Sequence, residues 1–200
     1  MINPWDERYA REEYIYGIEP NTYLKEKLSA IQPGKILFPA DGEGRNAVYA
    51  ASLGWETDAF DQSIEGQKKA IKLSSQKGVT INYFLKSLND WDPEPEQYDC
   101  IALIFVHIPE SLRKKVHQAA ITALKPGGML ILEAFTINQL ERTSGGPKIA
   151  ELLFTADQIE DDFKNLQTTE IKETQILLDE GPFHYGLADI IQYCGIKSKP

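Results

Sequence analysis

Cysteine is scarce in this chain of 200 residues. Cys100 and Cys194 are the only two, and they form no C-x-x-C pair. Two isolated cysteines cannot build the disulfide framework of a small secreted domain, and without paired ligands at knuckle spacing we expect no metal ion. Stability must therefore come from a hydrophobic core, for which this length is sufficient.

Long apolar runs and clusters of basic residues are also missing. No stretch reaches the roughly 20 residues that cross a bilayer, and the N-terminus lacks a basic-then-apolar signal, so we expect a cytoplasmic protein without membrane contact. The formal charge is −9, and the densest basic run is Arg113-Lys114-Lys115, which is typical of a solvated helix face. An acidic chain without a basic stripe repels phosphate, which disfavours a nucleic-acid partner.

What the sequence does contain is a regular alternation of strand and helix patterns. The expected strands are 35–39, 56–60, 79–85, 99–106, 129–135, 168–178 and 185–193, and the expected helices include 45–53, 63–76 and 111–124. Asp179-Glu180-Gly181-Pro182 reads as a hairpin turn between the last two strands. This order predicts an α/β fold, a Rossmann-like, doubly wound, seven-stranded and mostly parallel sheet with an antiparallel C-terminal hairpin strand.

The segment from Lys35 to Gln62 is the most informative part of the chain. An apolar strand leads into Ala40-Asp41-Gly42-Glu43-Gly44, whose small residues let the backbone turn sharply and approach a ligand. A helix and a second strand follow and end in Asp61, about 20 residues beyond the glycines, where a carboxylate can accept hydrogen bonds from ribose hydroxyls. Because the turn and Ala47 also satisfy G-x-G-x-x-G/A, the pattern predicts a nucleoside cofactor and leaves an NAD site open.

The ends of the first four expected strands should meet at one place. In open α/β sheets, ligands bind outside the carboxyl ends of the strands. The segments there are 40–44, Asp61, 87–88 and 105–107. We therefore expect them to surround a single crevice.

These segments resemble the motifs of class I S-adenosylmethionine-dependent methyltransferases. The stretch from Ile36 to Ala47 resembles the first motif, and Asp61-Gln62-Ser63 resembles the acidic end of the second strand. Leu124-Lys125-Pro126-Gly127-Gly128-Met129-Leu130 resembles the turn before the fifth strand, which NAD dehydrogenases have no reason to carry. With Trp5-Asp6-Glu7-Arg8-Tyr9 and Tyr16-Gly17-Ile18-Glu19-Pro20-Asn21, nearly the whole chain is similar to small bacterial proteins of the tellurite-resistance type.

The resemblance implies S-adenosylmethionine as the cofactor and indicates its contacts. Asp61 would hold the ribose hydroxyls, and Phe105 would lie beneath the sulfonium. The other implied contacts are Ala40, Asp41, Gly42 and Gly44 for the methionine part, Gln62 and Ser63 for the adenosine, and Ser87 and Leu88 for the adenine edge.

The chain departs from the family pattern at three positions. Phe38 stands where the family usually has an acid, Ala40 where it has a first glycine, and Ser87 where an acid often ends the third strand. Asp41 can compensate for the missing acid, and Asp61 and the two motif glycines remain. We therefore expect cofactor binding to be retained.

Methyl transfer from a sulfonium is an in-line displacement, and the cofactor supplies the activated carbon. A thiolate or an oxyanion needs no base, whereas an alcohol or an ammonium must first lose a proton, which calls for a group such as histidine. His107, after the fourth strand, and His184, at the start of the last, are the candidate bases, and Tyr16 is a candidate catalytic contact from the N-terminal arm. The prediction is a methyltransferase acting on a small molecule such as a thiol or an oxyanion.

We expect one domain over residues 1–200, as a monomer or a homodimer. Its parts are an aromatic N-terminal lid at 1–33, a cofactor-binding core at 34–135, and a substrate-side loop with a closing hairpin at 136–200. The departures from the family pattern keep open a non-catalytic S-adenosylmethionine-binding or sensor module. An NAD-dependent oxidoreductase is less favoured, because the only Y-x-x-x-K, Tyr23 to Lys27, precedes the nucleotide turn.

Overall fold

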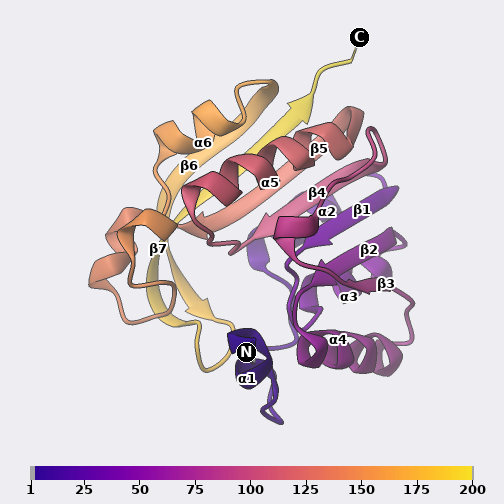
Figure 1. Ribbon diagram of the computed structural model, residues 1–200, viewed down its shortest axis with the longest axis vertical. Coiled ribbons are helices and arrows are strands. Elements are labelled where there is room, and N and C mark those ends of the chain that lie inside the picture. Colours follow the sequence, from indigo (N-terminus) through magenta and orange to yellow (C-terminus); the bar gives the residue numbers. More distant parts are fainter. Residues whose placement is uncertain (1–2, 200) are drawn as a thin grey trace.

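The computed structural model describes residues 3–199, so both ends of the expected 1–200 domain lie outside the described residues. Seven strands form one sheet in the order β3-β2-β1-β4-β5-β7-β6 (Figure 1). The strands are β1 Lys35–Pro39, β2 Glu56–Asp61, β3 Asn82–Leu85, β4 Tyr98–Ile104, β5 Leu124–Phe135, β6 Leu166–Asp179 and β7 Tyr185–Lys197. The first five pair in parallel, and β7 runs antiparallel between β5 and β6. The predicted fold class is confirmed.

Helices cover both faces of this sheet. They are α1 Pro4–Tyr9, α2 Thr22–Ser29, α3 Arg45–Ser52, α4 Ile64–Lys77, α5 Glu110–Ala123 and α6 Ala156–Asp162, with 3-10 turns η1 Leu88–Asp90, η2 Ile137–Glu141 and η3 Ala150–Leu152. One buried apolar cluster joins the sheet to α5 and α6, and a second joins it to α2, α3 and α4 (Figure 1). Within residues 3–199, no helix is both long and apolar enough to cross a membrane.

The starts of β3 and β5 differ most from their predicted positions. β3 begins at Asn82 rather than Val79, because the Val79 amide donates to the Ser74 carbonyl and closes the end of α4. β5 begins at Leu124, which pairs with Tyr98, and the next pair is Met129 with Cys100. The predicted Pro126–Gly128 turn is therefore a bulge inside the strand rather than a turn before it.

The glycine-rich turn after β1 is packed too tightly for a side chain at Gly44. This residue has φ of 85°, and a Cβ on it would lie 2.4 Å from the Ala70 Cβ in α4. We expect Gly44→Ala to lower the free energy of unfolding by about 3 kcal/mol, of which left-handed strain accounts for about 1 kcal/mol and overpacking for the rest. Urea denaturation measures this.

Gly54 provides the matched control for that prediction. It has φ of 91°, but a Cβ there would meet nothing within 4 Å. Gly54→Ala should therefore cost only the strain of about 1 kcal/mol, and Ala70→Gly should restore part of the stability of Gly44→Ala. Equal losses for the two alanine variants would show that the α3–α4 contact is not tight.

Candidate active site

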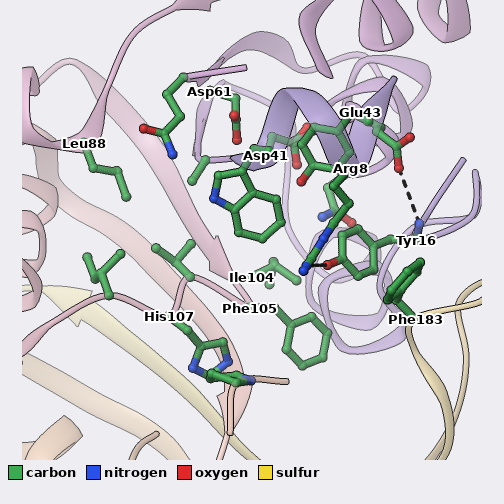
Figure 2. Close-up of a pocket in the computed structure, with 18 of the residues that line it drawn as sticks. Arg8, Tyr16, Asp41, Glu43, Asp61, Leu88, Ile104, Phe105, His107 and Phe183 are labelled. Atoms are coloured by element: carbon green, nitrogen blue, oxygen red, sulfur yellow. Dashed lines mark hydrogen bonds between the residues drawn. The ribbon is translucent and has the colours of Figure 1, made fainter. Parts of the chain in front are cut away.

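A cavity of about 490 Å³ opens at the carboxyl ends of the parallel strands, within the range of roughly 300–1,000 Å³ that holds small ligands. Its walls come from the ends of β1 to β5, from α1 and Tyr16, and from the turn between β6 and β7. In Figure 2, Asp61 and Leu88 lie on one side of the cavity and Tyr16 and Phe183 on another, with Ile104 between these sides. The strand ends thus surround one crevice, as the sequence indicates.

Two residues at this crevice have strained backbones. Residues other than glycine rarely adopt left-handed φ values, yet Ala40 has φ of 55° and Phe105 has φ of 54°. Both line the cavity, at the ends of the adjacent strands β1 and β4. Ala40 thus takes the conformation that glycine adopts most easily. Strain of this kind is retained where the surrounding structure fixes a functional geometry.

The motif glycines serve packing rather than the cavity wall. The Gly42 amide donates to Asp61 Oδ2 at 3.1 Å, and the Tyr83 hydroxyl donates to the Gly42 carbonyl at 2.6 Å. A Cβ on Gly42 would lie 2.5 Å from Tyr9 Oη. The cavity is lined by Ala40, Asp41 and Glu43 but not by Gly42 or Gly44. The predicted contacts of these two glycines with the methionine part remain predictions, and a Cβ at either position would face protein.

Asp61 lies at the cavity wall and is 6% exposed. Its Oδ1 accepts from the Ser63 amide at 2.9 Å and its Oδ2 from the Gly42 amide at 3.1 Å. Burial raises the pKa of Asp61, and these amides oppose the shift. Since each carboxylate oxygen accepts more than one hydrogen bond, lone pairs remain for two ribose hydroxyls.

The neighbours of Asp61 divide between the cavity and the protein interior. Gln62, Ser87 and Leu88 line the cavity where the sequence placed them. Ser63 does not: it is buried at the start of α4, where its hydroxyl donates to Asp6 Oδ1 at 2.6 Å and accepts from the Gly66 amide at 3.1 Å. Ser63 is thus a helix cap, and its predicted contact with the adenosine is corrected.

Asp41 supplies a carboxylate near the position where the family has an acid and this chain has Phe38. Phe38 is 1% exposed in the apolar core. The Ala47 amide donates to Asp41 Oδ2 at 3.2 Å, and burial raises the pKa of Asp41 to about 7. Asp41 thus lines the cavity beside Ala40, where a nearby cation would favour its ionised form.

A second part of the cavity, the acceptor chamber, has mainly aromatic walls. We define it by the cavity residues Tyr16, Phe105, Phe135, Leu152, Phe183 and His184. The His184 imidazole is its centre: the ring centroids of Tyr16 and Phe105 lie 4.5 and 4.7 Å from it. Because β5 and the β6–β7 turn lie beyond β4, this chamber is on the side of Phe105 opposite Asp61 and Leu88.

His184 is held as a neutral proton acceptor. Its Nδ1 lies 3.2 Å from Glu180 Oε2, and Arg45 Nη2 donates to the same oxygen at 2.9 Å. Burial lowers the pKa of His184, and Glu180 opposes that shift. When Nδ1–H donates to Glu180, Nε2 carries the lone pair, and it has no hydrogen-bond partner within residues 3–199. Glu180 was not predicted as a functional residue, because its only signal in the sequence is its position four residues before His184.

His107 lines the cavity, but both of its ring nitrogens are engaged by the protein. Nδ1 lies 2.7 Å from the Leu152 carbonyl, and Nε2 accepts from the Phe135 amide at 3.2 Å. Burial lowers the pKa of His107 to about 4. His107 thus links β5 to the segment around η3, and its prediction as a base is corrected because no lone pair remains free.

The N-terminal segment closes the cavity and is fastened by Glu43. Glu43 Oε2 accepts from the amides of Ile15 at 2.8 Å and Tyr16 at 3.4 Å, and its Oε1 accepts from Lys69 at 2.7 Å. Arg8 donates to the Tyr16 hydroxyl at 2.9 Å (Figure 2). This function of Glu43 was not predicted, because nothing in the sequence of the turn indicates a partner 27 residues earlier.

Comparisons with known proteins agree with this geometry. Residues 36–128 match the family model described as a methyltransferase domain. No curated protein sequence matches the chain. This matched segment is slightly less than half of the chain, and it agrees with the predicted class I S-adenosylmethionine-dependent methyltransferase and with S-adenosylmethionine as its cofactor. The fold is like that of TehB.

The similar solved structures share the fold at low sequence identity. One similar structure is described as the conversion of a disulfide bond into a thioacetal group during echinomycin biosynthesis. It superposes on this protein with a TM-score of 0.78 at 16% sequence identity, and the match covers 96% of this chain and 88% of that one. TehB from Haemophilus influenzae has a TM-score of 0.75 and 15% identity, covering 97% of this chain and 66% of that one, slightly less than two thirds. The N-methyltransferase NodS from Bradyrhizobium japonicum WM9, in complex with S-adenosylhomocysteine, has a TM-score of 0.70 and 15% identity, covering 98% and 89%.

Proposed function

We propose that this enzyme methylates a small molecule, with His184 as the proton acceptor. The observation that carries the proposal is the His184–Glu180 pair, whose unpartnered Nε2 lies in an aromatic chamber beside Phe105. We further propose that residues 1–33 act as a lid, 34–135 hold the cofactor and 136–200 form the acceptor side of one domain. It would work in the cytoplasm, as a monomer or a homodimer, without nucleic acid or membrane.

The chemistry of the cavity residues fits S-adenosylmethionine. Asp61 offers carboxylate oxygens to the ribose hydroxyls, and Gln62, Ser87 and Leu88 offer a mixed polar and apolar wall to the adenine. Asp41 stands where the cationic methionine part would lie. When bound, the cofactor supplies the methyl group and the sulfonium leaving group.

The protein's contribution is alignment and removal of a proton. Tyr16 and Phe105 line the cavity where they would position the acceptor beside the bound cofactor, which would raise the effective concentration of the acceptor. His184 Nε2 takes the acceptor's proton, and Glu180 stabilises the imidazolium that forms. Tyr16 carries a hydroxyl that Arg8 fixes in place, and this makes it a positioning contact in the proposal.

Titration calorimetry with S-adenosylhomocysteine tests the cofactor half of the proposal. We expect one site per chain, no competition by NAD, and turnover when an acceptor is added. Binding without turnover on any acceptor would instead indicate the sensor module. Competition by NAD would contradict the assignment of the cavity to a single nucleoside.

Removing His107 should affect stability more than catalysis. His107→Ala leaves the Phe135 amide and the Leu152 carbonyl without their partner, so we expect the free energy of unfolding to fall by about 1–3 kcal/mol. The loss of kcat should stay within about tenfold, because no proton passes through this ring. Urea denaturation and initial rates measure the two effects. A larger loss of kcat than in His184→Ala would reverse the assignment of the base.

A further inference from the structure

The walls of the acceptor chamber favour an apolar substrate. Phe105 and Phe135 lie 4.6 Å apart between ring centroids, and Phe135 lies 5.3 Å from the His184 ring. Leu152 and Phe183 complete the chamber. A polar body placed here would lose hydration without replacement, whereas sulfur makes favourable contacts with aromatic rings.

The charged groups beside the chamber are already paired. Arg45 donates to Glu180 at 2.9 Å and to the Tyr16 carbonyl at 3.0 Å, and Glu180 also holds His184. Within residues 3–199, a cationic amine beside His184 would therefore meet no free carboxylate, and an oxyanion there could reach an unpaired cation only in Arg8 at the exposed rim. Burying a charge without a close partner is costly.

The remaining charged residues of the cavity lie outside the chamber. Arg8 is exposed at the rim and donates to the Tyr16 hydroxyl. Lys86 follows β3 on the adenine side, and Asp41 and Asp61 belong to the cofactor side. Glu43 is paired with Lys69. Of these residues, Arg8 alone could meet an anionic acceptor, and it does so from the exposed rim over the Phe183 ring, 5.4 Å from the ring centroid.

His184 Nε2 is the polar atom that the chamber offers for a proton. Its ordinary pKa of about 6.5 lies nearer to that of a cysteine thiol, about 8.5, than to that of an ammonium, about 10.4. Simple alkanethiols are weaker acids than cysteine, but aliphatic alcohols are far weaker still. A neutral imidazole therefore assists a thiol at neutral pH better than it assists an alcohol, and an amine is disfavoured by the burial of its charge.

We propose that the acceptor is a small, uncharged thiol on an apolar body, an inference that rests on the methyltransferase function proposed above. The thiol sulfur forms a bond to the methyl carbon while the bond from that carbon to the cofactor's sulfur breaks, and its electron pair stays with the departing sulfur. His184 Nε2 takes the S–H proton and releases it to solvent. The products are a methyl thioether, S-adenosylhomocysteine and a proton.

A matched panel of acceptors tests this inference. 1-Butanethiol, 1-butanol and 1-butylamine share one apolar chain, and selenite represents the oxyanions. We expect kcat/KM for the thiol to exceed that for each of the others by about 100-fold, measured as S-adenosylhomocysteine formed. Calorimetry on the protein saturated with S-adenosylhomocysteine should also show the thiol binding about tenfold more tightly than the amine.

The pH dependence of His184→Ala separates proton removal from a structural role. With 1-butanethiol as the acceptor, methylation by this variant should depend on the thiolate that forms in solution. Because the thiolate fraction grows about tenfold per pH unit below the thiol pKa, the rate should rise by the same factor. The wild-type rate should change much less over the same range. A variant rate reduced by the same factor at every pH would overturn proton transfer to His184. Tyr185→Phe, an exposed residue next to His184 and outside the cavity, is the control and should match the wild type.

The outcomes distinguish the inference from the proposed function. If S-adenosylhomocysteine binds but the amine, the alcohol or selenite is methylated as fast as the thiol, the thiol assignment fails and the methyltransferase function stands. If S-adenosylhomocysteine does not bind, the proposed function itself fails.

Discussion

His184→Ala should lower kcat at pH 7 by roughly 10²- to 10⁴-fold, the usual contribution of a positioned general base. Affinity for S-adenosylhomocysteine should stay within about threefold, because His184 lies in the acceptor chamber rather than beside Asp61. Since burial lowers the pKa of His184, the neutral, active form should persist in the wild type below pH 6.5, and activity should fall only at more acidic pH. Steady-state rates from pH 5 to 9 measure both effects.

Glu180→Gln is the informative companion to that variant. Its amide oxygen can still accept from His184 Nδ1, but it no longer stabilises an imidazolium and leaves Arg45 without its carboxylate. We expect a drop in kcat of about tenfold and a lower kinetic pKa, because Glu180 raises the pKa of His184. Full activity in both His184→Ala and Glu180→Gln would exclude this pair from catalysis.

Asp61→Ala should weaken S-adenosylhomocysteine binding by roughly 10²- to 10⁴-fold. Two hydrogen bonds from ribose hydroxyls to a carboxylate contribute about 1.5–3 kcal/mol each, and the variant loses both. The increase in melting temperature that the ligand causes in the wild type should largely disappear. Calorimetry gives the affinity directly.

Two controls separate ribose binding from loop support. Asp61 also accepts from the Gly42 and Ser63 amides, so the unliganded stability of Asp61→Ala must be measured beside its affinity. Asp58→Asn alters a buried carboxylate of the same strand that lies outside the cavity and bonds to Asn82 and Tyr98. It should leave affinity unchanged. Unchanged affinity in Asp61→Ala would remove Asp61 from the ribose site.

The sequence predicted the sheet and the position of the crevice well, because both follow from periodicity and chain order. Parallel strands must bring their carboxyl ends to one edge, and this places Ala40, Asp61, Leu88 and Phe105 together on the cavity wall. The order of the elements alone therefore predicts which residues lie together at the ends of these strands.

The sequence pattern does not predict which way a side chain points or which distant residue it bonds to. Ser63 follows Asp61 by two residues, yet its hydroxyl turns to Asp6 and the start of α4. His107 looked free for catalysis because its partner, the Leu152 carbonyl, lies 45 residues away in an irregular segment. The pairing of His184 with Glu180 depends on the shape of the hairpin turn, which no spacing rule fixes.

The division of the cavity also bears on how such an enzyme can change over evolutionary time. In the proposed arrangement, its nucleoside half would be formed by the ends of β1 to β3, whereas the acceptor chamber draws on Tyr16, Phe135 and the turn before β7. Mutations in the hairpin can therefore alter which compound is modified while the methyl donor is still recognised. Divergence among related sequences should concentrate in residues 136–189, and grafting this segment from a homologue should exchange acceptor preference in a single step.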